Sequence, residues 1–256
     1  MEPLRAQTQI IYALMLRDMR SRFFGNGLGF AVAVAWPLVH IIILLLMYTA
    51  SGRTTPYGDS LVLFFSTGLV PFITFSYMSR FIMYSLIMNR PLLGFPIVKI
   101  TDVLFARSIL ECLGAIIMTI ALLIILWFCD IDFVPHDIVQ ASFAFGSCIL
   151  LGLGLGVVNA MIAMAFPMWA TGYTLIVIAL YASSGILFVP DSLPEILRYY
   201  LSFNPVLQSV EWMRSAYYDG YGTLVLDKGY VLTWGVLSLF GGLFIERFVR
   251  SRLLQA

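Results

Sequence analysis

Long apolar runs, separated by polar or proline-containing segments, dominate the hydrophobic pattern of this chain. A helix needs roughly 20 apolar residues to cross the hydrocarbon core of a bilayer. We therefore predict one all-α membrane domain over residues 1–256, with six transmembrane helices. The predicted spans are residues 28–50, 61–83, 103–128, 138–166, 173–189 and 230–245. The fourth and fifth runs lie close together, but Pro167 and their combined length favour two spans over one.

The segment between the last two spans, residues 190–222, does not fit either a span or a loop. It contains two short aromatic-rich pieces separated by Asn204 and Pro205. Each piece is too short to cross a bilayer, and both are too apolar for an ordinary loop. Backbone that enters a membrane and returns is tolerated only where protein or a water-filled path surrounds it. We predict a pair of re-entrant helices forming an outer gate, with Asn204 as N-cap of the second and a Glu211–Arg214 ion pair.

Aromatic side chains recur in the spans and in the predicted gate. Most are expected to pack or to lie at the membrane interface, and a minority to line a sugar path, since aromatic rings combine apolar area with a polar handle. The candidate channel or gate residues are Tyr48, Phe72, Tyr77, Tyr181, Tyr199, Tyr200, Trp212, Tyr217 and Tyr218. The sequence leaves open which gate aromatics would contact sugar and which a protein partner.

Composition strengthens the membrane interpretation. Apolar residues make up 61% of the chain and charged residues 11%, whereas soluble domains are nearer one half and one quarter. The mean hydropathy is +0.93. The net charge of +1 gives no sign of nucleic-acid binding, and we expect none. The three cysteines lie in apolar runs without CxxC spacing and are expected to be packing residues.

The distribution of Lys and Arg predicts the orientation, because cytoplasmic loops are enriched in both. With the N-terminus in the cytoplasm, most basic residues fall inside, and only Arg53, Arg198, Arg214 and Lys228 fall outside. The acidic residues of the connecting segments fall mainly outside. We therefore predict a multi-pass membrane protein with both termini in the cytoplasm.

Residues 1–26 form an amphipathic pattern, with apolar side chains on one broad face. This pattern predicts a helix lying on the cytoplasmic leaflet. Arg17, Arg20 and Arg22 have two interpretations: they anchor the helix, or they also bind an anionic lipid head or phosphate. Asp18 precedes Arg22 by four residues and is expected to pair with it.

The loop between the second and third spans, residues 84–102, is short, apolar and basic. Its apolar residues are expected to be shielded from water by another surface. They could dip into the headgroup region or dock onto a cytoplasmic subunit. The candidate docking residues are Leu93, Phe95, Pro96, Ile97 and Lys99.

Two further patterns predict contacts within the bundle. Arg107 and Glu111 are four residues apart on the third span and are expected to form a structural ion pair. Gly152, Gly154 and Gly156 give the fourth span a small-residue face, which predicts close helix packing.

Enzymatic motifs are missing. There is no GxxxxGK[ST] nucleotide loop and no HExxH or Cys/His metal motif. Asp130 and Asp132 spell DxD, but they fall on a predicted outer loop where sugar nucleotides are absent. We expect no catalytic, cofactor or metal site in this chain.

Three motifs in order resemble the membrane permease of type-two ABC exporters, most closely the capsular polysaccharide export permeases. They are LRDMRSRFFGNGLGF (residues 16–30), LLGFPIVKITDVLFARSILE (92–111) and FVPDSLPEILRYYLSFNPVLQSVEWMRSAYYDGY (188–221). They resemble the family's basic N-terminal helix, its coupling helix and its extracytoplasmic re-entrant helices. One departure is Val32, where the family often has Trp; Trp36 follows one turn later.

The resemblance implies a homodimer in the bacterial inner membrane that works with two copies of a separate cytoplasmic ABC ATPase, which holds the ATP and Mg. It implies that residues 95–99 seat on that ATPase, and that a lipid-linked polysaccharide, often acidic, is exported to an envelope-spanning partner of the polysaccharide co-polymerase type. Arg17, Arg20 and Arg22 would meet the phosphate of this glycolipid. Export of O-antigen, teichoic acid, lipo-oligosaccharide or drugs remains an alternative, as do a membrane enzyme acting on lipid-linked sugars and a membrane scaffold.

Overall fold

The computed structural model describes residues 2–21, 28–52 and 54–253, and it is all-helical over these residues. The prediction of an all-α membrane protein is confirmed. The long helices are α1 (Glu2–Ser21), α2 (Leu28–Ala50), α3 (Leu61–Met88), α4 (Ile100–Phe128), α5 (Ile138–Ala165) and α9 (Lys228–Leu253). Three shorter α-helices lie between α5 and α9: α6 (Trp169–Ser183), α7 (Glu195–Ser202) and α8 (Pro205–Tyr217). Two 3₁₀ turns, η1 (Arg90–Gly94) and η2 (Pro190–Ser192), complete the described elements.

Among the described residues, five helices are long and apolar enough to cross a membrane: α2, α3, α4, α5 and α9. The sixth apolar helix, α6, has only 15 residues. Its helix ends at Ser183, six residues before the end of the predicted span 173–189. Gly185, at φ +74°, turns the chain there. The carbonyl groups of Gly185, Ile186 and Phe188 accept hydrogen bonds from the Arg214 side chain instead of continuing the helix.

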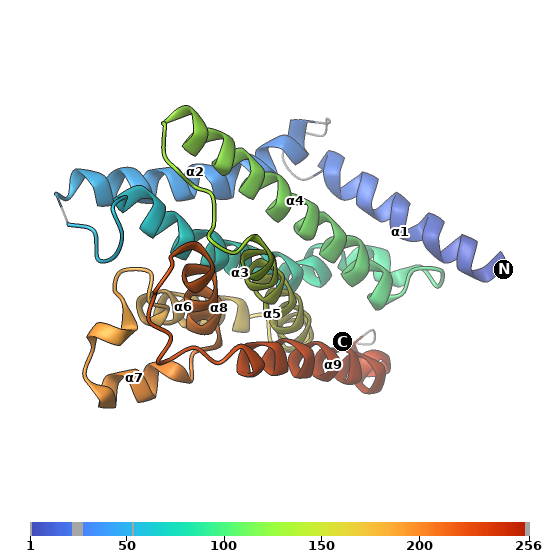
Figure 1. The fold of residues 1–256 in the computed structure, drawn as a ribbon. Coiled ribbons are helices and arrows are strands. Elements are labelled where there is room, and N and C mark those ends of the chain that lie inside the picture. The colour runs from blue at the N-terminus through green and yellow to red at the C-terminus, as the bar shows by residue number, and fades with distance from the viewer. Residues whose placement is uncertain (1, 22–27, 53, 254–256) are drawn as a thin grey trace.

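Helices α3 and α5 form the centre of the bundle (Figure 1). Nearly every residue of the central part of α3 is buried. Helix α9 packs closely along α5, and α8 packs against both α3 and α5. Helix α2 contacts α3 and α4, while α1 lies mainly on α4.

Glycines bring α5 close to its neighbours, as the small-residue face of this helix predicts. A Cβ atom added at Gly154 would lie 2.6 Å from the Gly235 carbonyl oxygen of α9 and would also collide with Ser238. On the other side, a Cβ at Gly152 would lie 3.1 Å from Met78 Cβ, and one at Gly156 would lie 2.9 Å from Ile82 Cβ. Glycine therefore allows α5 to pack closely on both α3 and α9.

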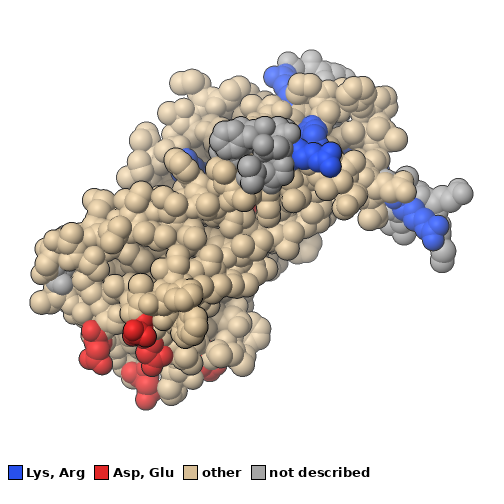
Figure 2. Space-filling model, turned by 90° about the horizontal axis from the view of Figure 1, so that it is seen from above, with Lys and Arg blue, Asp and Glu red and all other residues tan. Residues whose placement is uncertain are grey.

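The two ends of the bundle carry opposite charge, as Figure 2 shows. Helix α1 begins and α9 ends at the same end of the molecule (Figure 1), which we call the basic end. Its exposed basic residues are Arg5, Arg20, Arg90, Lys99 and Arg247. The opposite, acidic end contains the loops that follow α2 and α4 and the segment from α7 to α9. Its exposed carboxylates are Asp59, Asp130, Asp132, Asp137, Glu195, Asp219 and Asp227.

Candidate functional site

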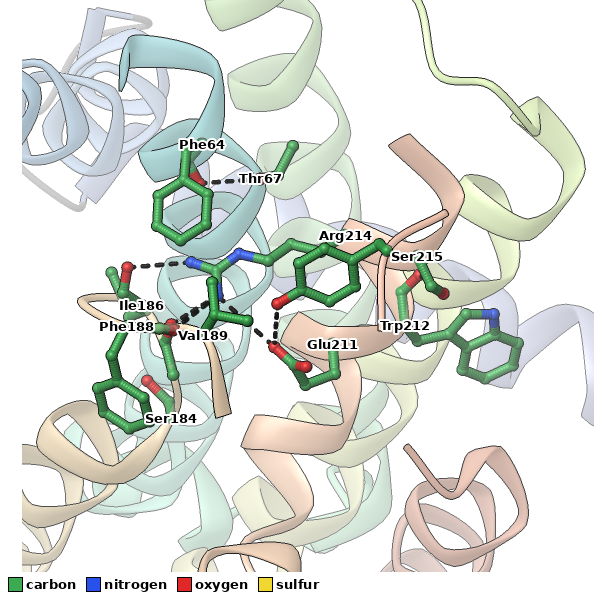
Figure 3. Close-up of polar contacts among 12 residues, drawn as sticks. Phe64, Thr67, Ser184, Ile186, Phe188, Val189, Glu211, Trp212, Arg214 and Ser215 are labelled. Carbon is green, nitrogen blue, oxygen red and sulfur yellow. Dashed lines mark hydrogen bonds and ion pairs between the residues drawn. The ribbon is translucent and has the colours of Figure 1, made fainter. Parts of the chain in front are cut away.

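Arg214 of α8 lies at the centre of the acidic half of the bundle and is fully buried. Its Nη1 donates to the carbonyl oxygens of Gly185 at 2.6 Å and Phe188 at 3.1 Å, and its Nη2 donates to that of Ile186 at 3.0 Å (Figure 3). These three carbonyls belong to the turn after α6. The guanidinium carbon also lies 3.9 Å from the centre of the Phe64 ring on α3. One side chain thus joins α8, α3 and the end of α6.

The predicted Glu211–Arg214 pair is confirmed, with Glu211 Oε1 3.5 Å from Arg214 Nη1. Tyr221 donates its hydroxyl to the same carboxylate oxygen at 3.0 Å. Burial raises the pKa of the Glu211 carboxyl, and the Arg214 guanidinium opposes that rise. Gly68 of α3 makes room for the arginine, because a Cβ there would lie 3.0 Å from Arg214 Nη2. The interior therefore accommodates the charge through three carbonyls, one carboxylate and one aromatic face.

Asn204 starts α8 and also ties it to α6. Its side-chain oxygen accepts from Val206 N at 2.9 Å, so the predicted N-cap is confirmed, and Pro205 occupies the first turn. Its Nδ2 donates to Ser183 Oγ at 2.9 Å. The Asn-Pro junction therefore fixes both where α8 begins and how α8 meets the end of α6.

The five predicted gate aromatics do not share one environment. Tyr199 and Tyr200 are exposed on α7, which has no buried residue. Trp212 is buried and donates to Gln140 Oε1 of α5 at 2.8 Å. Tyr217 is half-buried beside α3, α4 and α5 in a cavity of about 330 Å³. Tyr218 is also half-buried and packs edge-on against Tyr57 at 5.4 Å.

The four predicted channel aromatics lie where α2, α3 and α6 meet. The hydroxyls of Tyr48 and Tyr181 form a hydrogen bond between α2 and α6. Phe72 packs edge-on against Tyr181, with ring centroids 5.0 Å apart. The Tyr77 hydroxyl lies 3.2 Å from His40 Nδ1, which links α3 to α2. These aromatics therefore hold α2 and α6 to α3.

The turn between α3 and α4 at the basic end separates the predicted docking residues into two groups. Leu93 is buried and packs beneath the turn. Phe95 and Ile97 are exposed, with 58% and 65% of their surface accessible, and Pro96 and Lys99 are exposed beside them. Val98 N donates to the Phe95 carbonyl oxygen at 3.0 Å, which closes the turn. The outer surface of this turn, Phe95–Lys99, is called the apolar turn below.

The predicted phosphate-binding arginines also differ in their surroundings. Arg17 donates to Asp18 at 2.5 Å and forms a hydrogen bond with Asn89 at the end of α3. Arg20 is exposed. Arg22 lies outside the described residues, and so does its predicted pairing with Asp18.

Asp18 also points toward α4, which the sequence did not predict. Arg107 Nη1 lies 3.7 Å from Asp18 Oδ2, while Arg107 Nε lies 2.9 Å from Glu111 Oε1. The predicted Arg107–Glu111 pair is therefore confirmed and extended to α1. Gln7 further ties α1 to the start of α4 through a hydrogen bond with Asp102.

No group of three His, Cys, Asp or Glu side chains that could hold a metal ion occurs in the part of the chain that the structure describes. The carbonyl groups that bind Arg214 are not predictable from the spacing of side chains, because every residue carries a backbone acceptor. Two glycines were the sequence features that could have indicated this arrangement. Gly185 allows the turn, and Gly68 leaves room for the arginine side chain.

Residues 9–218 match the family described as ABC-2 type transporter. The chain is 30% identical over 250 residues to the polysialic acid transport protein KpsM of Escherichia coli, covering 98% of this chain and 97% of that protein. It is 28% identical over 256 residues to the capsule polysaccharide export inner-membrane protein CtrC of Neisseria meningitidis serogroup A, with 98% and 95% covered. The inner-membrane protein BexB of Haemophilus influenzae, also named for capsule polysaccharide export, is 24% identical over 245 residues, with 93% and 92% covered.

The family match extends from α1 to the end of α8. It therefore includes the apolar turn, the ion pairs of Arg107 with Asp18 and Glu111, and the contacts of Arg214. The chain belongs to the ABC-2 type transporter family.

Proposed function

We propose that this chain is the membrane subunit of an ATP-driven exporter that moves lipid-linked capsular polysaccharide out of the cytoplasm. The observation that carries this proposal is the similarity, over more than nine-tenths of both chains, to KpsM, CtrC and BexB. O-antigen, teichoic acid, lipo-oligosaccharide and drug export are the alternatives within the same family. An enzyme acting on lipid-linked sugars is a more remote alternative.

We further propose that the chain crosses the inner membrane six times, with the basic end in the cytoplasm. Positive charge on cytoplasmic segments is the general rule for such proteins, and the charge separation in Figure 2 supports this orientation. Helix α6 would then be the fifth crossing. Helices α7 and α8 would be the re-entrant pair, returning to the acidic end on the outer side.

The energy for transport comes, in this proposal, from two copies of a separate ABC ATPase that hold the ATP and Mg. Two copies of this chain would form the membrane part. The apolar turn supports the ATPase contact, because Phe95 and Ile97 project from a closed turn whose base is anchored by Leu93. Exposed apolar residues on a basic surface are expected to be covered by a partner.

The two ends of the exporter would then have different tasks. Of Arg17 and Arg20, the exposed Arg20 is better placed to meet a glycolipid phosphate, since Arg17 already has partners within the chain. At the acidic end, Tyr199 and Tyr200 are exposed for contact with sugar or with an envelope-spanning partner.

Deletion of the gene in its host tests the function directly. Capsular polymer is expected to accumulate in the cytoplasm and to disappear from the cell surface, and a plasmid copy should reverse both effects. Normal surface polymer in the deletion strain would overturn the proposal. Accumulation of O-antigen or teichoic acid precursors instead would identify the corresponding alternative cargo.

A further inference from the structure

Helix α2 exposes an ionisable side chain near its middle. His40 is the thirteenth of the 23 residues of α2, in a sequence whose other residues are almost all apolar. It is exposed, and so is Trp36 one turn earlier. The imidazole faces α3, where its Nδ1 lies 3.2 Å from the Tyr77 hydroxyl. At this depth, its short side chain cannot reach either membrane surface.

A second basic group lies on the same side of α3. Tyr77, Arg80, Phe81 and Tyr84 are half-buried, whereas residues 78, 79, 82 and 83 between them are buried. The half-buried residues recur at helical spacing and so share one face. Arg80 follows Tyr77, the residue that His40 contacts, by three residues on α3 and so lies one turn further along the same face. It forms no ion pair with any of the residues that the structure describes.

An arginine at this depth is costly if it faces lipid. It lies eight residues before the end of α3, about 12 Å along the helix axis. Ionisable groups inside a membrane usually face a water-filled path or a partner, and they mark the routes of substrates. Glu111, which lines the same small cavity as Tyr77, is already within ion-pair distance of Arg107. The strip formed by His40, Tyr77 and Arg80 therefore has the positive charge of Arg80, unpaired among the described residues, beside the hydrogen-bonded Tyr77–His40 pair.

We propose that His40, Tyr77 and Arg80 form a binding site for an anionic group, a phosphate or carboxylate, carried by the exported glycolipid. A guanidinium can donate two parallel hydrogen bonds to either group. The hydrogen-bonded Tyr77–His40 pair adds one neutral donor, which is His40 Nε2–H if Tyr77 donates to Nδ1 or the Tyr77 hydroxyl if Nδ1–H donates. The inference rests on the proposed export function and adds a second binding position, within the membrane, beyond the arginines of α1.

Export in cells tests the site with matched arginine variants. In the deletion strain, Arg80→Gln is expected to accumulate polymer inside, while Arg80→Lys keeps part of the export because it keeps the charge. Arg5→Gln, a change at an exposed arginine of α1, serves as the control and should export normally. Equal membrane levels and equal ATPase co-purification would show that Arg80→Gln still folds. Export by Arg80→Gln at the level of the control would overturn the site but leave the proposed function intact.

Binding can be measured without transport, so its result does not depend on the cargo. The purified chain in phosphatidylcholine nanodiscs is titrated with lysophosphatidic acid, a single-chain phosphate monoester, and binding is followed by native mass spectrometry. Arg80→Gln and His40→Leu should weaken binding, the former by at least about tenfold, as expected for loss of a charge-assisted contact. Lysophosphatidylcholine should bind all variants equally. Equal binding of lysophosphatidic acid to wild type and Arg80→Gln would overturn the proposal.

A second arm separates the cargo from ordinary membrane lipid. The titration is repeated in nanodiscs that contain phosphatidylglycerol. Unchanged binding of the probe supports a site reserved for the cargo's anionic group. Displacement of the probe by phosphatidylglycerol would make a membrane lipid the occupant and would overturn the assignment to cargo.

Discussion

Arg214 donates from Nη1 to the carbonyl oxygen of Gly185 at 2.6 Å, across 29 residues of sequence. Gly185 adopts a left-handed conformation, φ +74°, directly after the last turn of α6. The chain can therefore stop the helix and present successive carbonyl groups to one guanidinium. The pairing sets the position of α8 relative to α6, and so the geometry of the acidic end.

Loss of this arginine should destabilise the protein strongly. Arg214→Gln leaves Glu211 buried without its ion-pair partner and removes donors from three carbonyls, so we expect the free energy of unfolding to fall by about 3–5 kcal/mol. Thermal unfolding in detergent would measure it. Adding Glu211→Gln should restore part of the loss, because the buried charge is then gone. Arg247→Gln, at an exposed arginine of α9, is the control and should change stability by less than about 0.5 kcal/mol.

The contact between α5 and α9 gives a second prediction. Gly154→Ala places a methyl group 2.6 Å from the Gly235 carbonyl oxygen, so α9 must shift, at an expected cost of about 1–3 kcal/mol. Ser238→Ala should not rescue it, because the backbone carbonyl remains. Gly146→Ala is the matched control on the same helix, where nothing lies within 4 Å of the new Cβ. Equal melting temperatures for the two alanine variants would contradict the packing argument.

The apolar turn should be required for binding the ATPase. Phe95→Asp puts a charge into the expected contact without disturbing an internal one, so co-purification of the ATPase should fall at least tenfold. Lys99→Glu should also reduce it. Lys99 Nζ lies 3.3 Å from Gln7 Oε1, so Gln7→Ala is needed to separate loss of that link from loss of docking. Arg198→Glu, at the acidic end, should leave the complex intact. Full complex formation by Phe95→Asp would reject the assignment.

The α1 arginines should differ in effect. Neutralising Arg17, Arg20 and Arg22 together is expected to block surface polymer with the complex still assembled. Within this set, Arg17→Gln should also lower thermal stability, by about 1–3 kcal/mol, because it removes the donor that Arg17 supplies to Asp18 Oδ1 and to Asn89 Oδ1. Arg20→Gln, on an exposed side chain, should affect export alone. Normal capsule in the triple variant would indicate that these residues serve only to anchor α1.

Contacts set by short sequence spacing were predictable. The Arg107–Glu111 and Glu211–Arg214 pairs lie four and three residues apart, and helical geometry alone brings such residues together. The Asn204 cap and the glycine face of α5 likewise depend on local rules. The long apolar runs were sufficient to predict an all-α membrane protein.

Contacts between distant segments were not predictable from spacing. Nothing near Leu93 shows that it turns inward while Phe95 turns outward, since the cover is supplied by the cluster that includes Leu14 and Leu104. The hydrogen bond between Arg17 and Asn89 joins residues 72 positions apart. The end of α6 was predicted too late because apolar residues continue to Val189, while the backbone of that stretch pairs with Arg214.

The shortness of α6 has a consequence for the lipid around the protein. Fifteen residues rise about 22 Å, whereas a typical hydrocarbon core is about 30 Å thick. If α6 is the fifth crossing, the bilayer beside it must thin, and each ångström of hydrophobic mismatch costs a fraction of a kcal/mol. The protein would then be sensitive to membrane thickness. Export should run faster in membranes whose lipids have shorter acyl chains than in membranes whose lipids have longer ones.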